Sequence, residues 1–313
     1  MNDALRFDGV VKTYGRRRAL DGLSLRVPAG VVAGLVGSNG AGKTTLMGVA
    51  AGLLRPRAGA VDVLGGGPFD AARHSGRVAL LPQDAELPRD APPGALLAFY
   101  GALQGLDRDA ARRQAAELLD RVHLADRARS PSRTLSHGMR KRVMLAQCFV
   151  GAPELILLDE PLNGLDPRET AAMREFLREQ RGRRTLLISS HNLHEIEAIC
   201  DYVIFIEHGR VVRADTLEAV TGRAEQLTCL LGEGPTPDVE ALRSALNGMA
   251  IELDFDAGSR ALVCRYRADR HDAGAVNAAL LPRLLGQGCA LLELRRGERL
   301  ETQYLAPRDG DAR

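Results

Sequence analysis

The sequence has little cysteine, and its cysteines form no pattern that would hold a metal or cross-link a scaffold. Five cysteines occur among 313 residues, and no two form a C-x-x-C pair. The seven histidines include no H-E-x-x-H pattern. These absences argue against a disulfide scaffold and a structural zinc site. They predict that most cysteines are small buried residues in a protein of the reducing cytoplasm.

Long apolar runs and an excess of charge of one sign are also absent. No run approaches the roughly 18 apolar residues of a membrane-spanning helix, and the early acid Asp3 argues against a secretory signal. The formal net charge is only +2, which gives no sign of polyanion binding. We therefore expect no nucleic-acid partner, and any action at a membrane would need a partner protein.

The chain does contain a glycine-rich loop with the spacing G-x-x-x-x-G-K-[ST], formed by Gly37, Ser38, Asn39, Gly40, Ala41, Gly42, Lys43, Thr44 and Thr45. It follows the apolar run 31–36 and precedes a helix-prone stretch at 46–51. This context favours a nucleotide-phosphate cradle over a plain glycine-rich turn, because backbone N–H groups and the helix start would face phosphate oxygens. Lys43 would reach the β- and γ-phosphates, Thr44 would ligate Mg²⁺, and Thr45 would start the helix.

Two acids follow a second apolar run, residues 155–158. Such a run, ended by Asp159 and Glu160, predicts a central parallel strand whose carboxyl end carries function. In P-loop nucleotidases an acid at this place holds Mg²⁺, usually through water, and the next can orient an attacking water as a general base. We assign these roles to Asp159 and Glu160. The alternative is a carboxylate pair on the surface.

The apolar and polar pattern up to residue 222 predicts an α/β fold. Helical periodicity at 92–124 and 137–150 indicates a helical subdomain, about 88–150, inserted into it. Asp166, Pro167 and Glu169 have the layout of a helix start, with Asp166 as the cap. The other expected elements are strands at 4–11, 19–27, 31–36, 59–64 and 185–190, a turn at 12–18, a hairpin closed at 28–30, helices at 166–180 and 193–200, and a hairpin at 202–214.

Beyond residue 222 a smaller unit is expected. Its segments 227–231, 239–246, 249–255, 261–267, 274–285 and 290–294 read in order as β, α, β, β, α, β. That order is the ferredoxin-like motif of α+β proteins. We therefore expect an ATPase domain at 1–222 and an accessory carboxy-terminal domain at 223–313.

The order of the motifs resembles that of the ATP-binding cassette (ABC) family. The segment 135–142 begins Leu-Ser-His-Gly-Met, and residues 163–166 read Asn-Gly-Leu-Asp. Together with the glycine-rich loop and the strand-end acids, they are similar to that family over residues 4 to about 222. The resemblance implies a P-loop NTPase fold, the cassette with an inserted helical subdomain, that binds ATP and Mg²⁺ and hydrolyses ATP.

The resemblance also implies roles for residues that mean little alone. Tyr14 resembles the aromatic that stacks on adenine, and His191 the switch histidine that contacts the γ-phosphate. Gln83 resembles the glutamine that couples the nucleotide site to the membrane partner. Gln83 is also a catalytic candidate, as is Lys43, and a metal-binding candidate, as is Thr44. Otherwise these would be a strand-end tyrosine, a histidine after a strand and a loop glutamine.

The signature segment departs from the usual L-S-G-G-Q at two places, with His137 for a glycine and Met139 for the glutamine. Ser136 and Gly138 are kept, and the resemblance implies that they approach the γ-phosphate on an opposing subunit. Asp166 is placed with them among the nucleotide-binding residues. His137 is interpreted as filling an open position, with a pH-sensitive contact as the alternative.

The implied assembly is a head-to-tail dimer, a homodimer or a heterodimer with another cassette, acting on integral-membrane permease subunits at the cytoplasmic face. Gln83 and residues 92–106 are the expected docking surface. The tail 300–305 and the carboxy-terminal extension resemble exporters of the drug, polysaccharide and metal-related class, although 300–305 could equally be an amphipathic helix packed on its own domain. The alternatives are a soluble ABC protein acting on nucleic acid or ribosomes, against which the single cassette and the lack of heptads argue, and a regulatory nucleotide-binding module, against which Glu160 argues.

Overall fold

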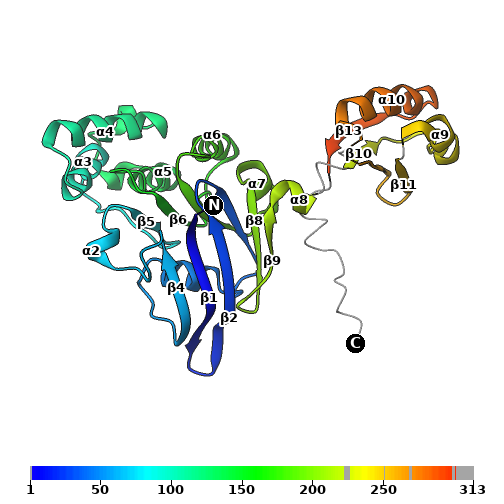
Figure 1. Cartoon of the computed structure of the whole chain (residues 1–313). Helices are drawn as coiled ribbons and strands as arrows, with labels where there is room; N and C mark the ends of the chain where they lie inside the picture. Colours follow the sequence, from blue (N-terminus) through cyan, green and yellow to red (C-terminus); the bar gives the residue numbers. More distant parts are fainter. Residues whose placement is uncertain (1, 222–225, 250, 268–269, 298–299, 301–313) are drawn as a thin grey trace. The chain divides into compact units, whose positions relative to one another are not determined.

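The computed structural model describes residues 2–221, 226–249, 251–267, 270–297 and 300. The chain forms two compact units, Met1–Asp215 and Thr216–Arg313 (Figure 1). The expected boundary after residue 222 and the tail at 301–305 lie outside the described residues.

The first sheet of unit 1 is antiparallel and contains β1 (Asp3–Tyr14), β2 (Arg17–Pro28) and β4 (Ala58–Val63), in the order β2-β1-β4. The expected turn at 12–18 is wrong in extent, because Lys12 still pairs with Leu20 and Tyr14 with Arg17. Backbone pairing continues into the solvent-exposed tip, where polar side chains had suggested a loop. Residues 28–30 were expected to close a hairpin, but they lead instead into the second sheet.

The second sheet carries the carboxyl-terminal strand ends that matter for function. Its order is β5-β6-β7-β3-β8-β9, with parallel pairing from β5 to β8. Asp159 lies opposite Ser189 and Val36 opposite Ser190, so three strands end at one edge. The strands are β3 (Val32–Val36), β5 (Val78–Leu81), β6 (Leu155–Asp159), β7 (Thr185–Ser190), β8 (Tyr202–Glu207) and β9 (Arg210–Thr216). Every residue of β3, β6 and β7 is buried, as their apolar runs predict.

In unit 1 the helices α3 to α7 fall within segments that were expected to be helical, whereas the short α2 was not expected. The helices α3, α4 and α5 lie together at one end of the unit (Figure 1). The helix that was expected to start at Asp166 does so, because the Asp166 carboxylate accepts a hydrogen bond from the Glu169 N–H at 2.8 Å. The helices are α1 (Lys43–Ala50), α2 (Ala71–His74), α3 (Pro93–Leu103), α4 (Arg108–Arg121), α5 (His137–Gln147), α6 (Pro167–Arg178) and α7 (Leu193–Ile199).

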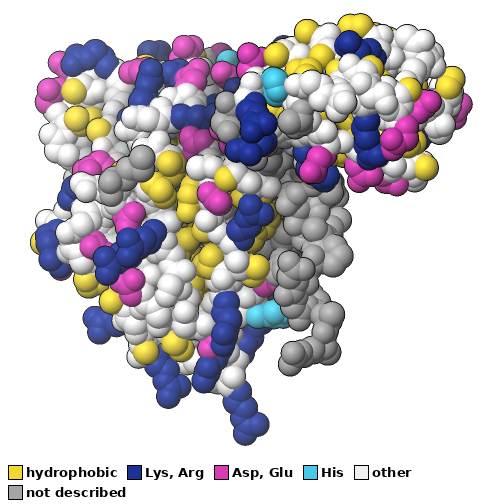
Figure 2. Space-filling view, turned by 45° about the vertical axis from the view of Figure 1, so that its right-hand side comes forward, with side chains coloured by type: hydrophobic (Ala, Val, Ile, Leu, Met, Phe, Trp, Pro, Cys, Tyr) yellow, Lys and Arg dark blue, Asp and Glu magenta, His cyan; other side chains and the backbone are white. Residues whose placement is uncertain are grey.

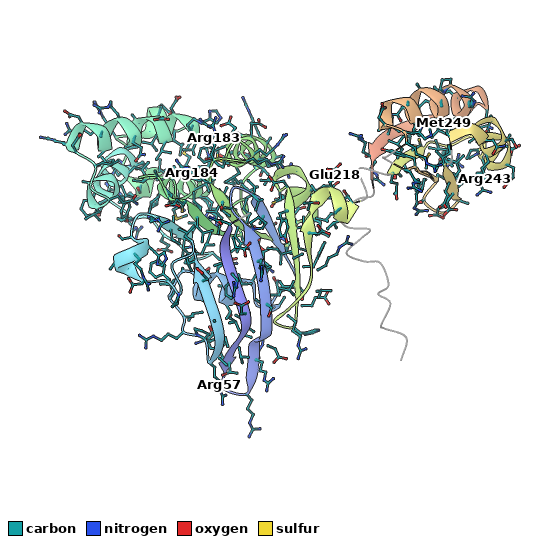
Figure 3. The ribbon with its side chains drawn as sticks, in the orientation of Figure 1. Arg57, Arg183, Arg184, Glu218, Arg243 and Met249 are labelled. Atoms are coloured by element: carbon teal, nitrogen blue, oxygen red, sulfur yellow. The ribbon has the colours of Figure 1, made fainter. Side chains whose placement is uncertain are left out.

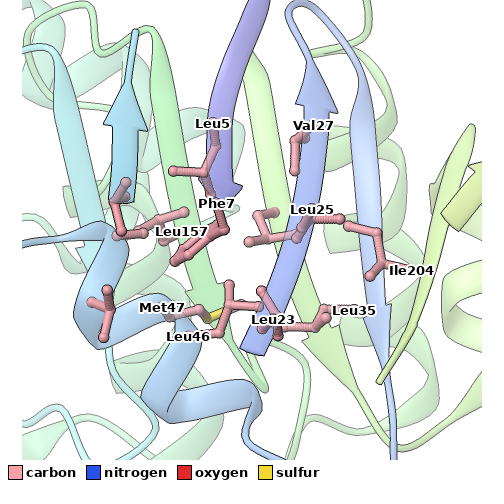
Figure 4. Close-up of a cluster of buried hydrophobic side chains, with 14 of the residues drawn as sticks. Leu5, Phe7, Leu23, Leu25, Val27, Leu35, Leu46, Met47, Leu157 and Ile204 are labelled. Atoms are coloured by element: carbon pink, nitrogen blue, oxygen red, sulfur yellow. The ribbon is translucent and has the colours of Figure 1, made fainter. Parts of the chain in front are cut away.

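The main core of unit 1 joins both sheets through α1. Figure 4 shows Leu5, Phe7 and Leu25 of the first sheet beside Met47 of α1 and Leu157 of β6. All five side chains are at most 4% exposed. Because the buried face of α1 is fixed between the sheets, the loop that leads into α1 is fixed as well.

Unit 2 has its own core and the element order β, α, β, β, α, β after the short helix α8 (Leu217–Thr221). The sheet order is β11-β12-β10-β13, with antiparallel pairs throughout. The Arg243 guanidinium donates to the Leu253 carbonyl at 2.6 Å, which ties the first of its two longer helices to the sheet (Figure 3). The elements are β10 (Gln226–Leu231), α9 (Val239–Ala245), β11 (Glu252–Asp256), β12 (Ala261–Arg265), α10 (Ala273–Gly286) and β13 (Leu291–Arg296).

The cysteines are buried and free, as predicted: Cys148, Cys200, Cys229, Cys264 and Cys289. Burial raises the pKa of the Cys148 thiol to about 12 and that of Cys229 to about 11. Such thiols stay protonated and unreactive at neutral pH.

No helix within the described residues is long and apolar enough to cross a bilayer. Acidic and basic side chains are interspersed over much of the face in Figure 2. This fits the near-balanced charge of the sequence.

Leu157→Ala should destabilise unit 1 by about 2–5 kcal/mol, because it leaves a cavity in a well-packed core. Leu157 is fully buried. Urea unfolding followed by circular dichroism measures the change. Leu53→Ala is the control, since Leu53 is 69% exposed and such surface changes stay within about 0.5 kcal/mol. Equal stabilities for the two variants would contradict this account of the core.

Candidate functional site

The glycine-rich loop joins β3 to α1 with almost no free space around its glycines. A β-carbon on Gly37 would lie 2.4 Å from the Ile206 carbonyl oxygen, and one on Gly42 would lie 2.5 Å from the Ala19 carbonyl oxygen. Gly42 also has φ +112°, in the left-handed region that glycine adopts most easily. It turns the chain directly into α1, which therefore begins at Lys43 and not, as expected, at Thr45.

Two cationic side chains bind the loop. Lys43 is only 7% exposed, and its Nζ donates to the carbonyl oxygens of Gly37 at 2.7 Å and Ser38 at 3.3 Å. Arg17, which the sequence analysis did not select, donates from Nη2 to the Gly40 carbonyl at 2.9 Å. Together with the start of α1, these cations make the loop favourable for an anion.

The strand-end acid Asp159 connects three elements through hydrogen bonds. It is 2% exposed, and its Oδ2 accepts from the Thr44 hydroxyl at 2.7 Å. Its Oδ1 accepts from the hydroxyl of Ser189 on the neighbouring strand, and the same hydroxyl accepts from the Glu160 N–H at 2.9 Å. Ser189 is not among the candidates selected from the sequence. The available signal was a hydroxyl at the end of a buried strand, but it needed the strand register to be interpreted.

Glu160 is nearly buried and has an uncommon backbone conformation. Its residue exposure is 7% and its φ is +50°. This left-handed conformation costs a non-glycine residue about 1–3 kcal/mol and is concentrated at functional sites. Its Oε2 lies 3.0 Å from Nδ1 of His191, whose side chain is 61% exposed. The buried carboxylate is therefore held from the solvent side by a histidine that has room to move.

These residues surround one cavity of about 610 Å³, lined by Tyr14, Arg17, Ala19, Asn39, Gly40, Gly42, Lys43, Thr44, Thr45, Gln83, Asp159, Glu160, Asn163 and His191. Most of the candidates selected from the sequence thus lie around a common space. Tyr14 is half exposed on its wall, and the Lys12 ammonium lies 5.5 Å from the centre of its ring. Arg17, Ala19 and Asn163 are lining residues that had not been selected.

Six candidates do not line this cavity: Gly37, Ser38 and Ala41 of the glycine-rich loop itself, and Ser136, Gly138 and Asp166, which are more distant in the sequence. Ser136 caps α5 by accepting from the Met139 N–H at 3.1 Å, and Asp166 caps α6. A second hollow of about 540 Å³ lies beside the signature helix and is lined in part by Gln83, His137 and Met144. Gln83 lines both spaces.

The oxygen atoms of Thr44, Asp159 and Gln83 suit a hard divalent cation such as Mg²⁺. No group of three or more His, Cys, Asp or Glu side chains that could hold a metal is found among the described residues. Mg²⁺ usually keeps several waters and binds through one or two protein ligands together with substrate phosphates. The residues therefore fit a Mg²⁺ ion that arrives with a phosphate ligand.

A buried lysine in α5 is a further charged group that was not among the candidates selected from the sequence. Lys141 is 5% exposed, and burial lowers the pKa of its ammonium, while Asp159, Glu160 and Asp84 act in the opposite direction. A lysine on an amphipathic helix is ordinarily solvated, so the pattern gave no signal for it. Its position adds positive charge near the strand-end acids.

Comparisons with known proteins agree with this geometry. A family model described as "ABC transporter" matches residues 20–163. The daunorubicin resistance ATP-binding protein DrrA3 of Streptomyces coeruleorubidus is 38% identical, covering 88% of this chain and 87% of that protein. The Nod factor export ATP-binding protein I of Burkholderia orbicola (strain AU 1054) is 36% identical, covering 78% of this chain and 80% of that protein.

Among solved structures, an ATP-binding subunit of an ABC transporter superposes with a TM-score of 0.63 at 28% identity. The match covers 70% of this chain and 92% of that one.

Ser189→Ala should destabilise the protein by about 1–3 kcal/mol, because it removes the hydrogen bonds that the Ser189 hydroxyl makes to one oxygen of a buried carboxylate and to a buried N–H. Asp159 and the Glu160 amide are the groups affected. Chemical denaturation measures the effect, and Ser38→Ala, an exposed position on the loop, is the control. A Ser189 variant as stable as the Ser38 variant would contradict the bridging role.

Proposed function

The chain belongs to the ABC transporter family as an ATP-binding subunit of the export class, and we propose that it hydrolyses ATP as half of a head-to-tail dimer. The observation that carries the proposal is the convergence of Lys43, Thr44, Asp159, Glu160 and His191 on one cavity. That set supplies phosphate binding, metal binding and water activation in one place.

In the proposed complex, the loop and Lys43 bind the phosphates of ATP, and Tyr14, which also lines the cavity, stacks on adenine. Thr44, Asp159 and Gln83 hold Mg²⁺, which neutralises phosphate charge when bound. Thr44 and Asp159 are already 2.7 Å apart through their hydrogen bond. The Asp159 carboxylate is fixed on its other side by Ser189, so it needs little reorganisation.

Glu160 is proposed as the general base that orients the attacking water. Its position directly after the strand directs it into the cavity beside the loop. The contact with His191 restrains the carboxylate until the histidine turns to the γ-phosphate. His191, with its exposed side chain, can make that change without disturbing the core.

The second half of the site is proposed to come from another copy of the chain or from a related cassette. Ser136, Gly138 and Asp166 do not line the cavity of their own chain. In a head-to-tail dimer, Ser136 and Gly138 of one subunit would close over the ATP held by Lys43 of the other. Loss of the γ-phosphate after hydrolysis would remove the bridging charge and allow the dimer to open.

We propose that the chain consists of two domains. The helices α3, α4 and α5 form the helical subdomain at about 88–150, inside an ATPase domain at 1–222. Residues 223–313 form an accessory domain, for which the ferredoxin-like class is supported by the strand order β11-β12-β10-β13.

The proposed partners are integral-membrane permease subunits, with the chain peripheral at the cytoplasmic face. Relatives named for drug resistance and for Nod factor export support an exporter. The docking surface is proposed around Gln83 and α3. Phe99 and Leu103, one turn apart on α3, are 57% and 68% exposed, and such an apolar patch suits a protein interface. The alternative of a soluble ABC protein acting on nucleic acid or ribosomes is not favoured.

Glu160→Gln should retain ATP binding, lower hydrolysis by at least about a hundredfold, as expected for loss of a general base, and accumulate an ATP-bound dimer. Phosphate release and light scattering after size exclusion measure the two effects. Glu154→Gln is the matched control, since Glu154 is an exposed acid next to the other end of the same strand. Parental hydrolysis by the Glu160 variant would remove the assigned role.

Phe99→Ser combined with Leu103→Ser should reduce co-purification with an integral-membrane partner from detergent-solubilised membranes, because both changes remove apolar contact area. The measurement is the ratio of partner to subunit on the affinity resin. Leu53→Ser, at a position 69% exposed elsewhere, is the control. Sedimentation of the parental chain with ribosomes or nucleic acid, and never with membranes, would overturn the transport proposal.

A further inference from the structure

His137, the residue that departs from the usual signature, packs against Gly164 in the loop that precedes α6. His137 is the first residue of α5, directly after the cap Ser136. Its ring atoms Nε2 and Cδ2 lie 2.9 and 3.2 Å from the place where a β-carbon on Gly164 would stand. Gly164 has φ +82°, so its backbone presents a surface without a side chain. The imidazole ring occupies that surface.

In a second contact of the same kind, a side chain of α6 lies against a glycine of α5. The Glu169 carboxylate of α6 lies 2.4 Å from the place of a β-carbon on Gly138 in α5. The same carboxylate pairs with Arg142 at 2.8 Å, and the Arg142 side chain is only 9% exposed. The start of α5 thus places His137 against Gly164 in the loop before α6, and α6 places Glu169 against Gly138 of α5. We call these two contacts the α5–α6 interlock.

The two sides of the interlock belong to different nucleotide sites. Two residues of the loop 160–164, Glu160 and Asn163, line the cavity of their own chain. Ser136 and Gly138 do not line it. In the proposed dimer, Ser136 and Gly138 contact the nucleotide bound by the partner subunit. The interlock therefore joins the loop 160–164, which belongs to the chain's own nucleotide site, to the signature segment, which belongs to the partner's site.

We propose that His137 is a positioning residue that couples the two ATP sites of the dimer through its ring contact with Gly164. The inference rests on the proposed function and adds a chain-specific contact to it. A glycine, the usual residue at this position of the signature, has no side chain to make the contact. When the loop at 160–164 shifts with its own nucleotide, the ring transmits that shift to the start of α5.

A double-mutant cycle tests the contact. Gly164→Ala should lower ATP turnover for two reasons: φ +82° is strained for a residue with a side chain, and the new methyl group would also meet the imidazole. Adding His137→Ala should restore turnover by about threefold or more, since residues in contact commonly couple to this extent. Alanine is a good residue for a helix start, so the helix should be retained.

Gly182→Ala is the matched control. Gly182 also has a positive φ, +71°, but nothing lies within 4 Å of its β-carbon position. Its effect on turnover should be the same in the parental chain and in the His137→Ala variant. If Gly164→Ala has the same effect in both backgrounds, the ring contact is not the coupling element.

The second readout is the cooperativity of hydrolysis with ATP concentration. Wild type should give a Hill coefficient above 1, and His137→Ala should bring it close to 1 while ATP binding to the monomer is retained. An unchanged coefficient overturns the inference. Glu160→Gln distinguishes failure of the proposed function from failure of this inference. If Glu160→Gln does not trap a dimer, the proposed function fails. If it traps a dimer but the effects of Gly164→Ala and His137→Ala on turnover are additive, only the role of His137 is removed.

Discussion

The parallel register of β6 with β7 is the constraint on which the site depends. Asp159 lies opposite Ser189, and the loop after β3 emerges from the same edge of the sheet. One serine hydroxyl then bridges the Asp159 carboxylate and the Glu160 amide, while the Thr44 hydroxyl binds the other oxygen of Asp159. A shift of one residue in this register would separate the acids from the loop. The chemistry is therefore positioned by buried apolar strands more than by the exposed segments.

Much of this was predictable from local pattern. The glycine spacing at 37–42 and the apolar runs that end at Asp159 and Ser190 report local conformation, and adjacent parallel strands place their carboxyl ends together. Ser189 was not predictable in the same way, because its role depends on which strand neighbours β7. The hairpin of β1 and β2 extends to Tyr14 and Arg17 through backbone pairing, which polar side chains at the tip do not reveal. The four-residue strand β5 is too short to carry a periodic signal.

The signature segment shows that a recognisable motif does not by itself predict where its residues lie in the fold. Ser136 and Gly138 are recognisable in the sequence, yet only the fold shows that they do not line the cavity of their own chain. His137 departs from the family pattern and makes a contact that the pattern could not contain. Departures of this kind are informative because a side chain where glycine is usual must find space, and here that space lies over another glycine.

The burial of all five cysteines has a practical consequence for labelling. Thiol-reactive dyes attack the thiolate, and burial keeps the thiols of Cys148, Cys229 and Cys264 protonated at neutral pH. A single cysteine introduced on the surface would therefore be modified selectively in the folded protein, without first removing the native ones. The wild-type background is thus already suited to placing a fluorophore or a spin label on each half of an assembly and following its opening and closing in solution.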